Sequence, residues 1–106
     1  MTTVYWLVKL KAGVTAEDYQ AFVRRVDYPA VKRIASIRNY RSTRVAGSIP
    51  PGAAVPFDFI DVVEVDDLEA YVQDLDHHPA VEEVHSQSAH MVEVLHCVVA
   101  EPVPPS

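Results

Sequence analysis

The order of strand-like and helix-like segments is the feature that most limits what this chain can fold into. Strands are predicted where β-branched and aromatic residues alternate between two faces, over residues 3–11, 36–47, 57–65 and 92–100. Helices are predicted where apolar residues recur every three or four positions, over residues 15–26, 67–76 and 80–91. The segments therefore follow the order β, α, β, β, α, β, with the second helical region in two pieces.

This order is that of the ferredoxin-like, or split βαβ, arrangement, an α+β fold whose helices cover one face of the sheet. We expect one domain over residues 1–100 and a proline-rich tail at residues 101–106. The predicted strands stay partly apolar on both faces, so the face without helices needs a cover. A second copy of the chain is the simplest cover, and a homodimer is expected.

The first helix has a clear start and an expected interruption. Thr15 followed by Asp18 predicts a capping pair at its beginning. Asp27, Tyr28 and Pro29 are expected to interrupt the helix, because the residue before a proline avoids the helical region. Pro29 can then begin a short second helical piece over residues 30–35.

Composition excludes several classes of function. The chain has 106 residues, 49% of them hydrophobic, and a formal net charge of −6, so nucleic-acid and anionic-membrane surfaces are not expected as partners. Its single cysteine cannot form an intramolecular disulfide, and no apolar run is long enough to cross a bilayer. Without a recognisable leader at its N-terminus, a cytoplasmic protein is expected.

Residues 76–97 hold all five histidines and the only cysteine. His85 falls on the apolar stripe of the predicted last helix, one turn beyond Val81, where an imidazole suits general acid–base catalysis. The alternative is a half-buried histidine bonded to the backbone. His96 and Cys97 alternate on the last strand, so one faces the helices and the other does not, and the sequence leaves open which of them reaches a cavity.

The remaining histidines favour structural roles. His90 lies near a helix end, and His77 and His78 precede Pro79 in a turn between helices. The spacings from His78 to His85 and from His85 to His90 do not match a helical zinc site, and no metal is expected.

Asp61 is the other polar candidate, because it lies between Ile60 and Val62 in a strand expected to line a cavity. It would either pair with an arginine such as Arg41 on the neighbouring strand or have a raised pKa and transfer protons. Trp6 offers a flat surface to an aromatic substrate, although a tryptophan on a strand is more often core or interface.

The segments "VKLKAGV", "RVDYPA" and "FIDVVEVDDLEA", in this order and spacing, make the chain resemble the small RedY-like proteins of bacterial secondary-metabolite pathways. These proteins belong to the dimeric α/β-barrel superfamily, in which two ferredoxin-like chains pack sheet to sheet. The resemblance covers about residues 3–99 and implies a setting in prodiginine or bisindole assembly. It also implies that a reactive intermediate is steered into a cyclised product without a cofactor.

The chain is similar, more distantly, to the plant-type polyketide cyclase that makes olivetolic acid, through "VTAEDYQAF", "FIDVVEV" and "HPA". By that similarity the pocket inside each barrel half would be lined by Val4, Trp6, Val8, Phe22, Val26, Asp61, Val63 and the last helix with Val81. The two protomers are expected to close their sheets around an apolar chamber that His85 enters. The cyclase's catalytic histidine and its tyrosine partner fall on Val81 and Leu75 here. Its mechanism therefore does not transfer to this chain.

These features together predict a cofactor-independent cyclase acting on a reactive aromatic, indole-derived intermediate. Confinement in an apolar cavity would orient the intermediate, and His85, Asp61 and either His96 or Cys97 would move protons. A cofactorless monooxygenase of polycyclic aromatic compounds and a carrier without catalytic activity are the alternatives. Haem degradation is disfavoured, since the apolar face of the first helix offers no histidine to bind iron.

Overall fold

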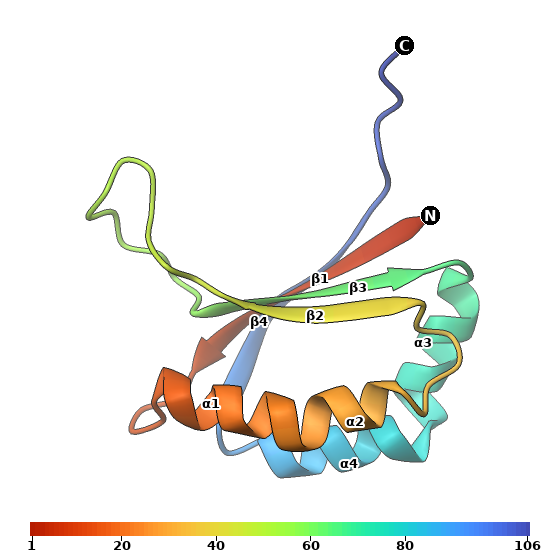
Figure 1. Cartoon of the computed structure of the whole chain (residues 1–106), viewed down its shortest axis with the longest axis horizontal. Coiled ribbons are helices and arrows are strands. Elements are labelled where there is room, and N and C mark those ends of the chain that lie inside the picture. Colours follow the sequence, from red (N-terminus) through yellow and green to blue (C-terminus); the bar gives the residue numbers. More distant parts are fainter.

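The four strands of the chain form one antiparallel sheet, seen almost edge-on in the computed structural model of residues 1–106 (Figure 1). They are β1 (Thr2–Leu10), β2 (Asn39–Arg44), β3 (Phe59–Val65) and β4 (Val92–Ala100), in the spatial order β2-β3-β1-β4. The strand order and the helices on one face confirm the predicted α+β, ferredoxin-like fold.

The helices begin at polar caps that the sequence makes recognisable. Before α1 (Ala16–Phe22), Thr15 Oγ1 accepts from the backbone N–H of Asp18 and the Asp18 carboxylate accepts from the backbone N–H of Thr15, both at 3.1 Å, which confirms the predicted capping pair. Asp67 caps α3 (Leu68–His77) through the backbone N–H of Ala70. None of the helices has the length and hydrophobicity needed to cross a lipid bilayer.

The expected interruption near Pro29 is wrong, because the backbone stays helical through it. A π-helical turn, η1 (Val23–Asp27), joins α1 to α2 (Tyr28–Val31) as one continuous rod (Figure 1). Pro29 has no N–H to donate to the carbonyl of Arg25, and the Tyr28 N–H instead donates to the carbonyl of Val23, five residues back. The wider turn thus absorbs the proline without a break.

Most predicted boundaries differ from the observed ones by a few residues, and the largest differences lie at the short helical piece, at β2 and at the last helix. The short helical piece ends at Val31, and residues 36–38 lie in turns rather than in β2, because Ser36 Oγ donates to Asp74 and the Ile37 N–H donates to the carbonyl of Ile34. The last helix, α4 (Pro79–Ser88), stops three residues before its predicted end. β4 spans the predicted residues 92–100.

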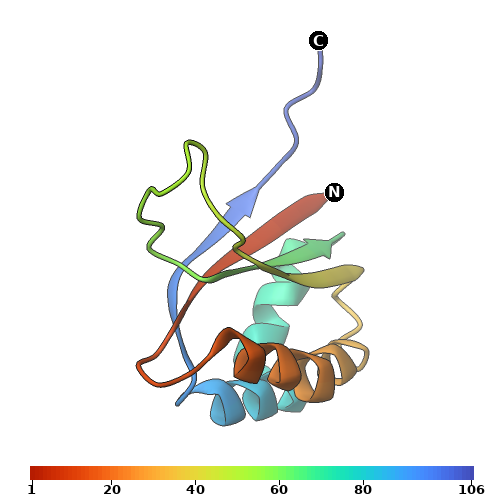
Figure 2. The same cartoon turned by 60° about the vertical axis from the view of Figure 1, so that its left-hand side comes forward.

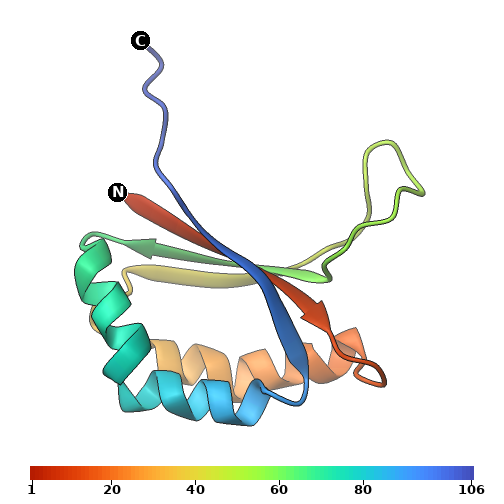
Figure 3. The same ribbon diagram turned by 180° about the vertical axis from the view of Figure 1, so that it is seen from behind.

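The two faces of the sheet differ in what covers them. The helices cover the face that carries the buried side chains Val4, Val8, Phe59, Val63 and Val65 (Figures 1 and 2). The other face, called here the open face, carries Tyr5, Leu7, Ile60, Val62 and Val98 in paired rows. The connection between β2 and β3 and the C-terminal residues both extend on the side away from the helices (Figure 3).

Candidate active site

A cavity of about 110 Å³ lies between the sheet and the helices of a single chain. Its location differs from the expected chamber between two protomers, because its walls come from both layers of one protomer. Sixteen of its twenty lining residues are hydrophobic, so the four others decide which polar side chains a ligand meets. These four are Asp27, Asp61, His85 and Ser88.

Asp61 forms part of the inner wall and is only 6% exposed. It stands on β3 opposite Trp6 on β1 and Ser42 on β2. Ser42 Oγ donates to Asp61 Oδ1 at 2.5 Å, and the Tyr19 hydroxyl donates to Asp61 Oδ2 at 3.1 Å. Both carboxyl oxygens therefore have a hydroxyl donor from the chain itself.

The expected pairing of Asp61 with Arg41 is wrong. Arg41 stands opposite Val62, so its side chain leaves from the open face, and its guanidinium lies 3.7 Å from the carboxylate of Glu64. Side chains one residue apart on a strand point to opposite faces, and Ser42 rather than Arg41 shares the inner face with Asp61.

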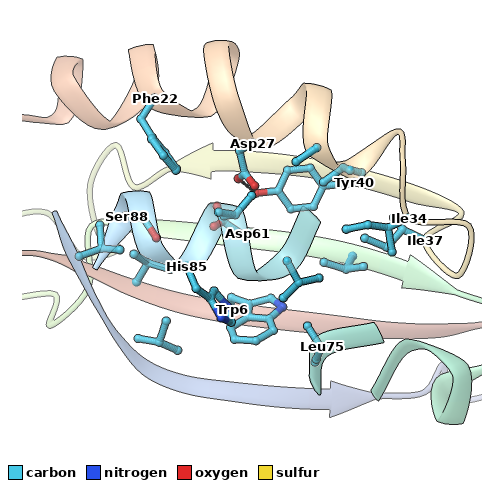
Figure 4. Close-up of a pocket in the computed structure, with 18 of the residues that line it drawn as sticks. Trp6, Phe22, Asp27, Ile34, Ile37, Tyr40, Asp61, Leu75, His85 and Ser88 are labelled. Atoms are coloured by element: carbon cyan, nitrogen blue, oxygen red, sulfur yellow. Dashed lines mark hydrogen bonds between the residues drawn. The ribbon is translucent and has the colours of Figure 1, made fainter. Parts of the chain in front are cut away.

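Asp27 brings a second carboxyl group to the same wall. It is the last residue of the π-helical turn and is 7% exposed, and its Oδ2 accepts a short hydrogen bond from the Tyr40 hydroxyl of β2. Figure 4 shows the carboxyl groups of Asp27 and Asp61 next to each other, with the Tyr40 ring reaching them. We call this cluster the acidic wall; its members are Asp27, Asp61, Tyr19, Tyr40 and Ser42.

Burial sets the protonation of the acidic wall. It is the main cause that raises the pKa of Asp61 to about 6; the hydrogen bond from Ser42 opposes the rise and the charge of Asp27 adds to it. Burial likewise raises the pKa of Asp27, against the hydrogen bond from Tyr40. The pKa values of Tyr19 and Tyr40 are raised by burial too, so both hydroxyls stay protonated and act as donors.

The cavity opens between α4 and β4. Two of its lining residues on this side, His85 and Val94, are exposed, Val94 to 46%, and Ser88 is partly exposed. We call these three residues the mouth. His85 therefore reaches the cavity from its solvent side, beside the indole of Trp6 (Figure 4). The Trp6 indole N–H donates to the Tyr71 hydroxyl at 3.2 Å, which fixes the ring as part of the wall.

The strand pairing shows which of His96 and Cys97 faces the helices. Cys97 is opposite Trp6 and shares its face, whereas His96 is opposite Leu7 on the open face. Neither residue lines the cavity, and both are exposed. Burial raises the pKa of the Cys97 thiol, which disfavours the reactive thiolate.

Five of the seven residues expected to bind substrate line the cavity, namely Trp6, Val8, Phe22, Val63 and Val81. Val4 and Val26 do not, contrary to expectation. Val4 packs beneath Tyr71 in the core cluster that includes Val63, and Val26 packs against the outside of a second core cluster around Tyr19. A residue on the face of a strand or helix that points toward the cavity can still lie beyond the end of the cavity.

The other histidines occupy structural or peripheral positions. His78 caps α4, since its Nδ1 accepts from the backbone N–H of Ala80 and its Nε2 donates to the carbonyl of Arg33, each at 3.0 Å. His77 ends α3, and His90 lies in the turn before β4. No three histidine, cysteine or acidic side chains come together in a way that could hold a metal ion.

Sequence reasoning missed most of the acidic wall. Asp27 and Tyr40 were not candidates, because Asp27 was expected in a break of the helix and Tyr40 in an unremarkable strand. The motif "RVDYPA" was the available signal: its acidic residue, two positions before the proline, ends the π-helical turn that points it inward.

The model of the REDY-like protein HapK family matches residues 2–103. The chain belongs to this family. No curated protein sequence matches it.

Solved structures show the same fold at low sequence identity. The crystal structure of HapK from Hahella chejuensis superposes with a TM-score of 0.80 at 20% identity, covering 100% of this chain and 96% of that one. A protein of Arabidopsis thaliana gives 0.81 at 15% identity, covering 100% and 99%. A dimeric ferredoxin-like protein from Thermobifida fusca gives 0.65 at 21% identity, covering 93% and 86%.

Proposed function

We propose that this member of the REDY-like HapK family is a cofactor-independent cyclase that directs ring closure of a reactive aromatic, indole-derived intermediate. The observation that carries the proposal is the buried carboxyl of Asp61, which has a pKa of about 6 and lies in the wall of a mostly apolar cavity. A carboxyl group in that pH range can both give and take a proton near neutrality.

Ring closure would follow from confinement and proton transfer. The apolar walls hold the intermediate in one orientation and exclude water, which suppresses hydrolysis and competing products. Asp61 would transfer a proton at the reacting ring, and the hydrogen bonds from Tyr19 and Ser42 hold its carboxyl group in position. His85 at the mouth is placed to exchange protons between the cavity and solvent.

The size of the cavity limits how the intermediate fits. A volume of about 110 Å³ is on the scale of one aromatic ring, since an apolar protein cavity of roughly 150 Å³ holds a benzene molecule. An intermediate with two aromatic units would place one against the acidic wall and the other in the mouth, against His85 and Val94. The ring-closing bond would then form between the inner and outer parts of the cavity.

The test is the product profile of the upstream enzymes with and without this protein. The proposal expects a shift toward one cyclised product, lost in Asp61→Asn and kept in Asp66→Asn, whose carboxylate is exposed and paired with Arg38. An unchanged product ratio with the wild-type protein would refute the cyclase. A shift that survives both Asp61→Asn and His85→Gln would instead indicate a carrier.

We further propose that the protein acts as a homodimer formed through the open face. Its exposed apolar side chains include Val98, and relatives of the same fold are dimeric, among them the protein from Thermobifida fusca. Val98→Glu should give a monomer in light scattering. Val72→Glu is the matched control, because Val72 is exposed to 46% on α3 and Val98 to 44% on the open face. A dimer that persists in Val98→Glu contradicts this interface.

A further inference from the structure

The carboxyl groups of Asp27 and Asp61 have no cationic partner in the chain. Each of the four ion pairs of the protein joins an exposed arginine to an acidic residue other than Asp27 and Asp61. No lysine or arginine lines the cavity. Two buried carboxylates side by side are costly without a counter-charge, so the pair must hold a proton or meet a positive charge from outside the chain.

One carboxyl oxygen of Asp27 and Asp61 is left available to accept a hydrogen bond from a ligand. The hydroxyls of Ser42 and Tyr19 occupy both oxygens of Asp61, and Tyr40 occupies Oδ2 of Asp27. Asp27 Oδ1 accepts no hydrogen bond from the chain, yet no fully buried side-chain oxygen lacks a partner. This oxygen therefore keeps some exposed surface, and since Asp27 lines the cavity, a ligand there can donate a hydrogen bond to it.

The geometry points to a binding site for a protonated nitrogen: we propose that Asp27 and Asp61 together hold the cationic nitrogen of an apolar, single-ring amine, imine or amidine group. This inference rests on the proposed function in taking the cavity as the substrate site, and it names Asp27 as a residue that binds substrate. Where the group is a protonated imine, its carbon is electrophilic: attack by a second ring forms a C–C bond, moves the C=N π pair to nitrogen and releases a proton from the attacking ring.

The titratable groups around Asp27 and Asp61 do not neutralise the two carboxyls, so the positive counter-charge comes from the ligand. The other titratable groups that line the cavity are Tyr19 on α1, Tyr40 on β2, Tyr71 on α3 and His85 on α4, and the Tyr28 hydroxyl on α2 accepts from the backbone N–H of Ser42. The tyrosines that bond the two carboxyls are neutral donors, and His85 stands at the mouth. In the empty site the pair holds a proton up to about pH 6, because burial raises the pKa of Asp61 to about 6 and also raises that of Asp27. A cationic ligand displaces that proton.

The test compares two probes of equal size by isothermal titration calorimetry at pH 7.5. Benzylamine is a cation at this pH, and benzyl alcohol is its neutral counterpart. Because hydrogen bonds to charged groups are stronger than neutral ones, the wild-type protein should bind benzylamine roughly tenfold or more tightly than benzyl alcohol. Asp27→Asn and Asp61→Asn should each remove this preference, whereas Asp66→Asn on the surface should keep it.

Proton release gives a second measurement that needs no variant. Titrations at pH 6 in two buffers of different ionisation enthalpy should show that benzylamine releases a fraction of a proton on binding and that benzyl alcohol releases none. Equal affinities for the two probes, or benzylamine binding without proton release, would overturn the inference. Neither result touches the product profile, so the cyclase proposal and this one fail separately.

Discussion

The acidic wall and the mouth of the cavity differ in nearly every property that governs acid–base chemistry. The acidic wall is buried, and three hydroxyls, one from α1 and two from β2, hold its carboxyl groups in place. The mouth is exposed, and its imidazole reaches the cavity from the solvent side. The comparison teaches that burial, rather than the local number of titratable residues, marks where a protein perturbs a pKa, since the histidine-rich stretch supplies only one of its five histidines to the cavity.

The largest expected effect is a difference in the rate of ring closure between a variant of the acidic wall and a variant of the mouth. Asp61→Asn should slow ring closure about a hundredfold or more, because nothing from solvent can replace a buried proton donor. His85→Gln should slow it only about tenfold, and added imidazole should restore the loss through the open mouth. Product formation by each variant, with and without imidazole, measures the difference. Equal losses that imidazole does not restore would contradict the division of roles.

A second prediction uses the pH dependence of stability. Folded Asp61 keeps its proton up to about pH 6, while the ordinary value is 3.8, so the folded state binds more protons between these values and the free energy of unfolding falls as the pH rises. Asn cannot ionise. The free energy of unfolding of Asp61→Asn should therefore rise relative to that of wild type between pH 4 and pH 7.5, by up to about 3 kcal/mol in urea unfolding. A pH-independent difference would contradict the raised pKa.

Removing a donor from the acidic wall should have a smaller effect. Tyr40→Phe leaves Asp27 Oδ2 without its hydrogen bond and should lower the free energy of unfolding by about 1–2 kcal/mol at pH 7. The loss should diminish at low pH, where Asp27 is protonated and needs the donor less. Tyr5→Phe on the open face is the control, and thermal unfolding of both variants decides whether the hydroxyl of Tyr40 is the one that matters.

The smallest effect is expected at the mouth. Ser88→Ala should change the free energy of unfolding by less than about 0.5 kcal/mol, as is usual for exposed positions without buried partners. Denaturation at several pH values should give the same result. A large change would mean that the mouth is closed by contacts absent from the single chain, such as those with a second protomer.

The fold was predictable because it depends on repeated patterns. Alternation in β1 and β3 and the capping pair at Thr15 each reappear as expected, and β4 has its predicted bounds. Local chemistry was less predictable. The break at Pro29 was expected from the conformational preference of the residue before a proline. The observed π-helical turn depends instead on the hydrogen bond from the Tyr28 N–H to the carbonyl of Val23.

The candidate site was predictable in part for a related reason. Trp6, Asp61 and His85 stand on regular elements, so their faces follow from periodicity. The meeting of Asp27 with Tyr40 joins two elements that sequence spacing does not relate. His85 lies at the opening of the cavity and not in the buried part of the apolar face of α4. Its exposure depends on how much of α4 the strand β4 covers.

The extra residue in the turn between α1 and α2 makes the chemistry of this protein adjustable by length alone. Shortening that turn by one amino acid would rotate Asp27 and α2 by about 100° relative to α1, so the Asp27 carboxylate would point away from the interior while α1 stays packed on the sheet. A lineage could therefore gain or lose an acid in its binding chamber through one codon's insertion or deletion, with no need to rebuild the scaffold around it.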